Sequence, residues 1–147
     1  MINNAAQADS ALTGVDGVKL AQSYVAAYND RDLDAMLAAL DENVVSHPAP
    51  LFGHRPNLGH NGVRSWWAAM LRSGQSYEVV VHEIRQLDAD RVAVLGEIRD
   101  AGKWLSPWAV VVRIRNGLIV ESHSYLSDEE LLAQRSIEVS WEAFAVG

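Results

Sequence analysis

The chain has 147 residues, of which 12 are Lys or Arg and 19 are Asp or Glu, so its formal net charge is −7 with neutral histidines. This length suits one domain with its own hydrophobic core, and the absence of cysteine excludes disulfides, thiol nucleophiles and thiolate metal ligands. The acidic balance and the dispersed basic residues disfavour nucleic-acid binding, and the chain has no run of 18 apolar residues that would predict a membrane span.

Both ends of the chain are expected to lie outside the folded core. Residues 1–14 contain no basic residue and no apolar block of signal-peptide length, so we interpret them as a disordered lead and expect a cytoplasmic protein. A single domain is predicted over residues 15–136. The tail, residues 137–147, is apolar and holds Trp141, so we expect it to pack, with a dimer interface as one place for it.

Two helices are predicted at the start of the domain. Apolar residues recur every three or four positions from Leu20 to Tyr28, and Asp16 is placed to cap this first helix. Residues 29–31 interrupt the pattern, and a second, shorter helix follows from a cap on Asp32. The two helices are expected to form a hairpin.

The next segment predicts a strand, a loop and a third helix. A short strand over residues 43–47 should stop at Pro48, because proline cannot donate to a strand ladder. Residues 48–62 hold three prolines and three glycines and predict a long loop, a kind of segment that is often functional. The third helix is predicted over residues 63–72, with two adjacent tryptophans on its apolar side.

The second half of the chain predicts an antiparallel meander. Its apolar stretches are separated by turn signals, which include Asp88-Ala89-Asp90 and Asn116-Gly117. The predicted strands cover residues 77–87, 91–100, 104–115 and 118–126. After the last strand, Ser127 and Glu130 form a capping box that predicts a terminal helix.

The last hairpin could adopt either of two registers. A two-residue Asn116-Gly117 loop would pair Ile114 with Ile119 and mix polar and apolar side chains on each face. A three-residue loop would pair Ile114 with Leu118, and we prefer it because the buried face sets the register. This register predicts an inner face of Trp108, Val110, Val112, Ile114, Leu118, Val120, Ser122, Ser124 and Leu126, and an outer face of Arg113, Arg115, Glu121, His123 and Tyr125.

In this order, the elements make an α+β fold in which a curved antiparallel sheet wraps around N-terminal helices. Residues 24–36, Tyr-Val-Ala-Ala-Tyr-Asn-Asp-Arg-Asp-Leu-Asp-Ala-Met, resemble the first helix and turn of the nuclear-transport-factor-2-like superfamily, and residues 108–121 resemble its final hairpin. The resemblance covers about residues 17–134. It implies the cone-shaped fold, also described as a cystatin-like or ketosteroid-isomerase-like α+β barrel, shared by ketosteroid isomerases, SnoaL-like polyketide cyclases and limonene epoxide hydrolases.

The resemblance also implies roles for individual residues. Tyr24 takes the position of the tyrosine that donates to the substrate oxyanion in ketosteroid isomerases, and His47 takes that of the aspartate that shuttles the proton. The second acid of the isomerases has no counterpart, because residues 108–110 read Trp-Ala-Val. The segment around His47 is similar to the SnoaL-like branch. The Asp-Arg-Asp relay of epoxide hydrolases has only a partial candidate, at residues 97–100.

His47 and Tyr24 are therefore the catalytic candidates. An imidazole titrates near neutral pH and can exchange a proton with a bound ligand, and a tyrosine hydroxyl can stabilise an oxyanion. The structural alternatives are a His47 that hydrogen-bonds a loop carbonyl and a Tyr24 that packs in the core. The side chains expected to bind substrate are Tyr28, Trp67, Trp108, Val110, Val112, Ser122, Ser124 and Leu126.

Two functions fit this pattern. One is a cofactor-independent acid/base enzyme, of isomerase, cyclase or hydratase/hydrolase type, that acts on a small hydrophobic carbonyl-bearing ligand in a conical pocket. The alternative is a non-catalytic module of the same fold that binds a hydrophobic small molecule or a protein partner. We expect no metal, because the spacing of His47, His54 and His60 matches no common zinc motif. We also expect no cofactor, since the sequence has no phosphate-binding glycine loop and no dinucleotide fingerprint. A homodimer is implied by the resemblance alone.

Overall fold

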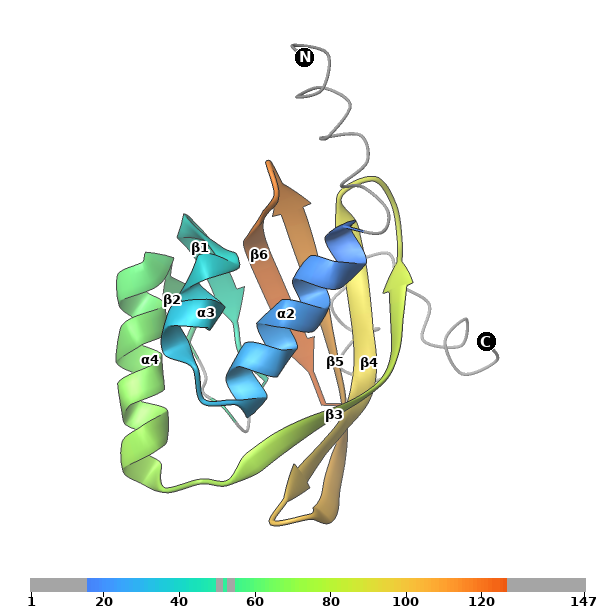
Figure 1. The fold of residues 1–147 in the computed structure, drawn as a ribbon. Helices are drawn as coiled ribbons and strands as arrows, with labels where there is room; N and C mark the ends of the chain where they lie inside the picture. The colour runs from blue at the N-terminus through green and yellow to red at the C-terminus, as the bar shows by residue number, and fades with distance from the viewer. Residues whose placement is uncertain (1–15, 50–51, 53–54, 127–147) are drawn as a thin grey trace.

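The computed structural model describes residues 16–49, 52 and 55–126 (Figure 1). In chain order, its elements are α2 (Gly17–Asn29), α3 (Leu33–Ala38), β1 (Leu40–His47), β2 (Asn57–Leu58), α4 (Gly59–Ser73), β3 (Tyr77–Gln86), β4 (Arg91–Asp100), β5 (Lys103–Arg115) and β6 (Leu118–Tyr125). The expected terminal helix, the tail with Trp141, the N-terminal lead and His54 lie outside the described residues.

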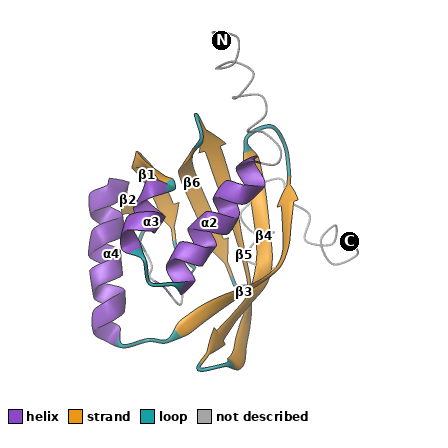
Figure 2. Cartoon of the chain, in the orientation of Figure 1, coloured by secondary structure: helices purple, strands orange, loops and turns teal. Residues whose placement is uncertain are grey.

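The six described strands form one curved sheet, and its two outer strands, β2 and β3, do not pair with each other. Their order is β2-β1-β6-β5-β4-β3, and only the β1–β6 pair is parallel among the described strands. Helix α2 crosses one face of this sheet, while α3 and α4 lie beside β1 and β2 (Figures 1 and 2). The α+β fold with a curved sheet around N-terminal helices, predicted from the sequence, is confirmed.

The helical hairpin forms as the sequence predicts, with one difference at its start. Asp32 caps α3 by accepting a hydrogen bond from the backbone N–H of Ala35 at 3.1 Å. Asp16 takes the predicted N-cap position of α2, but it has helical backbone angles and its side chain makes no capping bond. The turn between the helices passes through Arg31, whose φ of 55° is uncommon for a residue other than glycine. Its guanidinium compensates by donating to the carbonyl oxygens of Tyr28 and Tyr77 at 3.0 Å each.

The segment predicted as a long loop holds more structure than its composition indicates. Helix α4 begins at Gly59, four residues before the predicted start, and the two residues ahead of it pair with β1 as the short strand β2. The imidazole of His60 lies 2.8 Å from the carbonyl oxygen of Leu40 and ties this first turn to the sheet. A Cβ at Gly59 would lie 2.9 Å from the carbonyl oxygen of Glu42, so a glycine allows helix and strand to approach here.

The register predicted for the last hairpin is wrong, although the faces it predicted for the two serines are right. Asn116 and Gly117 form a two-residue turn with positive φ angles, and Ile114 pairs with Ile119. The register then shifts by one residue, which leaves Val120 without a partner. This β-bulge restores the alternation, so that Ser122 lies opposite Val112 and Ser124 opposite Val110 on the inner face.

The hydrophobic core lies between the inner face of the sheet and the helices. Its most deeply buried apolar side chains from the strands are Val44, Val92, Val94, Ile98, Val110, Val112 and Ile119. A second cluster on the outer face consists of Ala93, Leu95, Ala109, Val111 and Tyr125. Consecutive residues of β4 and β5 therefore contribute to opposite faces, as the two-residue period of a strand requires.

Strands β3 and β4 approach each other very closely at one glycine. The register between the strands shifts after Val81, and Gly96 pairs with that residue. A Cβ at Gly96 would lie 2.0 Å from the carbonyl oxygen of Val80, far inside van der Waals contact. The irregular pairing thus requires a residue without a side chain at this position.

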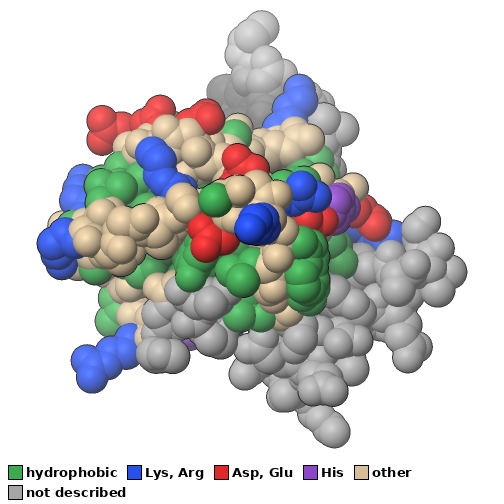
Figure 3. All heavy atoms as spheres, turned by 90° about the horizontal axis from the view of Figure 1, so that it is seen from below, with side chains coloured by type: hydrophobic (Ala, Val, Ile, Leu, Met, Phe, Trp, Pro, Cys, Tyr) green, Lys and Arg blue, Asp and Glu red, His purple; other side chains and the backbone are tan. Residues whose placement is uncertain are grey.

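The described surface carries mixed charge. Seen from below, acidic and basic side chains are interspersed with hydrophobic ones (Figure 3). None of the helices in the described part of the chain is long and apolar enough to cross a lipid bilayer.

Candidate functional site

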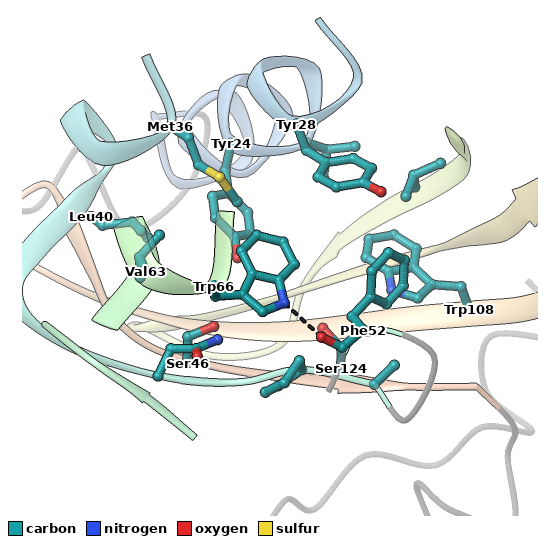
Figure 4. A pocket seen from close by; sticks show the side chains of 15 residues that line it. Tyr24, Tyr28, Met36, Leu40, Ser46, Phe52, Val63, Trp66, Trp108 and Ser124 are labelled. Atoms are coloured by element: carbon teal, nitrogen blue, oxygen red, sulfur yellow. Dashed lines mark hydrogen bonds between the residues drawn. The ribbon is translucent and has the colours of Figure 1, made fainter. Parts of the chain in front are cut away.

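A pocket opens between the helices and the inner face of the sheet (Figure 4). The cavity volume is about 60 Å³, which is smaller than the roughly 300–1,000 Å³ typical of small-molecule sites. Helices α2, α3 and α4 contribute to its lining together with β1, β3, β5 and β6. None of the described lining residues carries a formal charge.

Aromatic rings form one wall of the pocket. The Tyr28 ring meets the Phe52 ring edge-on at 5.9 Å between centroids, and the Trp66 ring lies 6.4 Å from each of them. The indole N–H of Trp66 donates to the carbonyl oxygen of Phe52 at 2.6 Å, which fixes the ring against the segment that follows β1. Trp108 of β5 also lines the pocket. Such a wall suits a flat apolar ligand.

The polar end of the pocket is built from hydroxyl groups. The Tyr24 hydroxyl hydrogen-bonds the side chains of Ser122 and Ser46, and the hydroxyl of Ser122 in turn donates to that of Ser46 at 3.1 Å. Ser46 and Ser122 are register partners on the parallel strands β1 and β6. Burial raises the pKa of Tyr24 above its ordinary value of 10.0, with the two serines opposing the shift, so the hydroxyl stays protonated and able to donate at neutral pH.

The hydroxyl of Tyr28 is occupied by the protein. It donates to the carbonyl oxygen of Tyr77 at 3.2 Å and accepts from the side-chain amide of Gln75 at 3.2 Å. Burial raises the pKa of Tyr28 as well, although Gln75 and Arg31 oppose that shift. Tyr28 therefore contributes its ring to the pocket wall, and Tyr24 is the tyrosine whose hydroxyl belongs to the polar end.

His47 lies on the other face of the sheet. Side chains alternate along β1, so Ser46 reaches the pocket while His47 points outward and stacks on His123, with 4.1 Å between ring centroids and 10° between ring planes. Burial, followed by the charge of His123, lowers the pKa of His47, and Glu121 partly offsets this. The structure does not bring His47 and Tyr24 together, which corrects the position expected for His47.

The residues predicted to bind substrate fall into three groups. Tyr28, Trp108 and Ser124 line the pocket. Val110, Val112 and Ser122 are fully buried in the sheet, and Leu126 packs against the core cluster. Trp67, which we expected to bind substrate, is buried beside Tyr28 with 6.3 Å between their ring centroids, and its neighbour Trp66 lines the pocket instead. Trp67 lies on the buried side of α4 together with Val63 and Met70.

Sequence reasoning missed several lining residues. Phe52 and Asn57 lie in the segment predicted as an irregular loop, and no local pattern marks them. Ser46 carried a usable signal, because strand alternation places it on the face opposite to His47. Val79 could not be placed, because the path of β3 past α2 depends on contacts far apart in sequence, including the bonds from Asn29 to both backbone groups of this valine.

Comparisons with known proteins agree with this architecture. A family model described as "SnoaL-like domain" matches residues 21–122. No curated protein matches the sequence. Many solved structures do. A candidate polyketide cyclase from Xanthomonas campestris pv. campestris is 23% identical, with a TM-score of 0.60 over 81% of this chain and 96% of that one.

Two further solved structures bear on the site. A candidate ketosteroid isomerase from Kribbella flavida is 16% identical, with a TM-score of 0.63 over 76% of this chain and 78% of that one. TerC, co-crystallized with polyporic acid, is 18% identical, with a TM-score of 0.65 over 83% of this chain and 99% of that one. At these identities the likeness shows the shared fold alone.

Proposed function

The chain belongs to the SnoaL-like domain family, and we propose that its pocket binds a small, uncharged, largely apolar molecule and orients an oxygen atom of that molecule toward Tyr24. The observation that carries this proposal is a protonated hydroxyl at the polar end of a pocket whose other walls are apolar and aromatic. One donor at a fixed position orients a ligand, and the aromatic rings supply most of the contact area.

The proposed ligand is neutral because no described lining side chain could pair with a charge. An ionised group moved from water into such surroundings loses far more hydration free energy than apolar contacts return. A carbonyl or hydroxyl oxygen fits instead, since it can accept from Tyr24 or exchange hydrogen bonds with Ser46 and Ser124. TerC, which has the same fold, was co-crystallized with polyporic acid, and this supports a pocket for small organic molecules in the present chain.

Binding is favoured over the acid/base reaction predicted from the sequence. That reaction needs a base beside the ligand, and His47 lies across the sheet from the pocket. The described lining residues include no carboxylate and no imidazole. Tyr24 can still polarise a bound carbonyl, but by itself this group orients and stabilises rather than removes a proton.

The test compares two ligands that differ in one oxygen. Binding of 2-acetylnaphthalene and 2-ethylnaphthalene is measured by titration calorimetry, which does not depend on any tryptophan as a reporter. Tyr24→Phe should weaken the ketone about fivefold to tenfold, since a net hydrogen bond contributes about 1 kcal/mol, and leave the ethyl compound unchanged. Tyr28→Phe is the matched control, because the partners of the Tyr28 hydroxyl, Tyr77 and Gln75, do not line this pocket. The Tyr24 hydroxyl, by contrast, is bonded to Ser46, which lines the pocket.

Removing the aromatic wall should have a different effect. Trp66→Ala should weaken both naphthalenes alike, because it takes away ring contact without touching the polar end. The proposal fails if neither compound binds, or if Tyr24→Phe and Tyr28→Phe change the ketone affinity equally.

A further inference from the structure

We propose that the outer face of the sheet carries a binding site for one divalent transition-metal ion such as Zn²⁺, formed by His47 of β1 with Glu121 and His123 of β6. The spacing of His47, His54 and His60 along the chain gave no reason to expect a metal. The fold brings two other candidate ligands, Glu121 and His123, close to His47, although both lie more than 70 positions later in the chain. This proposal does not depend on the function proposed for the pocket, which is on the opposite face.

The backbone alone places the three side chains on one face. Glu121 and His123 are two residues apart on β6, so their side chains point the same way. His47 is the register partner of His123 across the parallel β1–β6 pair. Neighbouring strands lie about 4.8 Å apart, so the three residues form a compact triangle whatever rotamers their side chains adopt.

The side-chain distances suit a metal ion. The candidate ligand atoms of the three residues all lie within 4.8 Å of one another, and Nε2 of His123 is 3.1 Å from Oε2 of Glu121. Zinc–nitrogen and zinc–oxygen bonds of about 2.0–2.1 Å in a tetrahedron put ligand atoms roughly 3.3 Å apart. One pair already has this separation, and the others need to close by at most about 1.5 Å.

The two imidazoles must turn for this to happen. Their planes are nearly parallel, so their lone pairs do not converge on one point until a ring rotates. Solvent exposure of 23% for the His123 side chain and 36% for Glu121 leaves room for that rotation. The ring of His123 also stacks on Tyr125 at 6.5 Å, which limits its positions and favours His47 as the ring that moves.

The donor set matches the preferences of zinc and its neighbours in the first transition series. Two neutral imidazoles and one carboxylate bind such ions well and leave a fourth position for water. Arg113 places a cation beside the site: its Nη1 lies 3.9 Å from Oε1 of Glu121, and its Nε lies 3.7 Å from Oδ2 of Asp90. The guanidinium can therefore stay with Asp90 when an ion takes the Glu121 carboxylate.

The sheet provides a matched control for an ordinary histidine–glutamate pair. His82 lies 2.6 Å from Glu97 on β3 and β4, and no described second imidazole accompanies it. If a surface pair of this kind were enough to hold a metal ion, His82→Ala would lower zinc binding as much as His47→Ala. The proposal requires that only the changes at the β1–β6 triangle have an effect.

The experiment uses the tag-free full chain after removal of metals by a chelator. Titration with Zn²⁺ in a calorimeter should give one ion per chain, and wild type and His82→Ala should bind equally. His47→Ala, His123→Ala and Glu121→Gln should each weaken binding at least about a hundredfold, because even partners outside the coordination shell are worth 10- to 100-fold. Titration with Co²⁺ should give visible absorption typical of a tetrahedral site, and His47→Ala should lose it.

Circular dichroism and thermal melting establish that each variant is folded. Glu121→Gln keeps the size of the side chain and removes only the carboxylate. Zinc binding by this variant therefore tests the proposal even if an alanine variant unfolds. The proposal is overturned if the wild type binds no stoichiometric Zn²⁺, or if the His47→Ala/His123→Ala double variant binds it as tightly as the wild type. In the second case the ion belongs to other residues.

Discussion

Replacing Gly96 by alanine should destabilise the whole domain, because the added methyl group has no space. A Cβ at this position would lie 2.0 Å from the carbonyl oxygen of Val80, 2.9 Å from the carbonyl carbon and 3.1 Å from Cα of Val81. All three are backbone atoms, so no side chain can rotate away. Strand β3 would have to move by about 1 Å to restore normal contact, against interiors that tolerate little displacement.

The magnitude follows from what β3 holds in place. Overpacking of this kind costs about 1–3 kcal/mol, and a shift of β3 would also strain the bonds that join Asn29 to Val79 at 2.7 and 2.9 Å, each worth about 1 kcal/mol. We therefore expect a loss of about 3 kcal/mol in the free energy of unfolding. With a urea m-value of about 2 kcal/mol/M, the unfolding midpoint should fall by about 1.5 M.

Gly74→Ala is the control that separates this overlap from backbone preference. Gly74 ends α4 with a φ of 70°, and no atom lies within 4 Å of the place that an added methyl group would occupy. Its replacement should cost only the strain of a left-handed alanine, about 1–2 kcal/mol. Urea unfolding of both variants, followed by circular dichroism, makes the comparison. A Gly96→Ala midpoint within 0.3 M of wild type, on the order of 0.6 kcal/mol at that slope, would refute the reasoning.

Three further predictions concern a helix cap, a pH dependence and assembly. Asp32→Ala should lower the free energy of unfolding by about 1 kcal/mol in urea, because it removes the cap on Ala35. The pKa of Asp88 is lowered to about 2, above all by its hydrogen bond with Arg91. The ionised carboxylate therefore stabilises the fold above pH 4, and this stabilisation is lost as the carboxylate is protonated between pH 4 and 2. Asp88→Asn should therefore cost about 1 kcal/mol at pH 7, after allowance for solvent screening, and the difference from wild type should vanish near pH 2. Light scattering after gel filtration should give twice the chain mass if the homodimer implied by the resemblance forms; a single-chain mass would contradict it.

The sequence predicts elements better than it predicts which face a strand presents. Helix α2 and the meander follow from periodicity, and the face that holds Ser124 follows from burial. The position of His47 was predicted wrongly because the predicted strand begins only at residue 43. Five residues contain too few alternating side chains to show which face of the strand is buried. The extra residues of β1, from Leu40 onward, become visible only once the strand pairs with β6.

The bulge at Val120 shows a second limit of sequence reasoning. Two local preferences conflict in this hairpin, since Asn116-Gly117 favours a two-residue turn and the apolar face favours a shifted register. A regular hairpin can satisfy either the turn preference or the face preference. A prediction from sequence that assumes a regular hairpin must therefore violate one of the two. The structure satisfies both by inserting one unpaired residue, a solution that neither pattern predicts alone.

The contact between Ser46 and Ser122 joins residues 76 positions apart, and this has a consequence for how the domain folds. Closing so long a loop is entropically costly, so the β1–β6 pairing should follow the formation of the local hairpins of the meander. The polar end of the pocket would then exist only in the fully folded chain. A ligand held there stabilises that state alone, so it should raise the midpoint of global unfolding without protecting the β4–β5 hairpin separately.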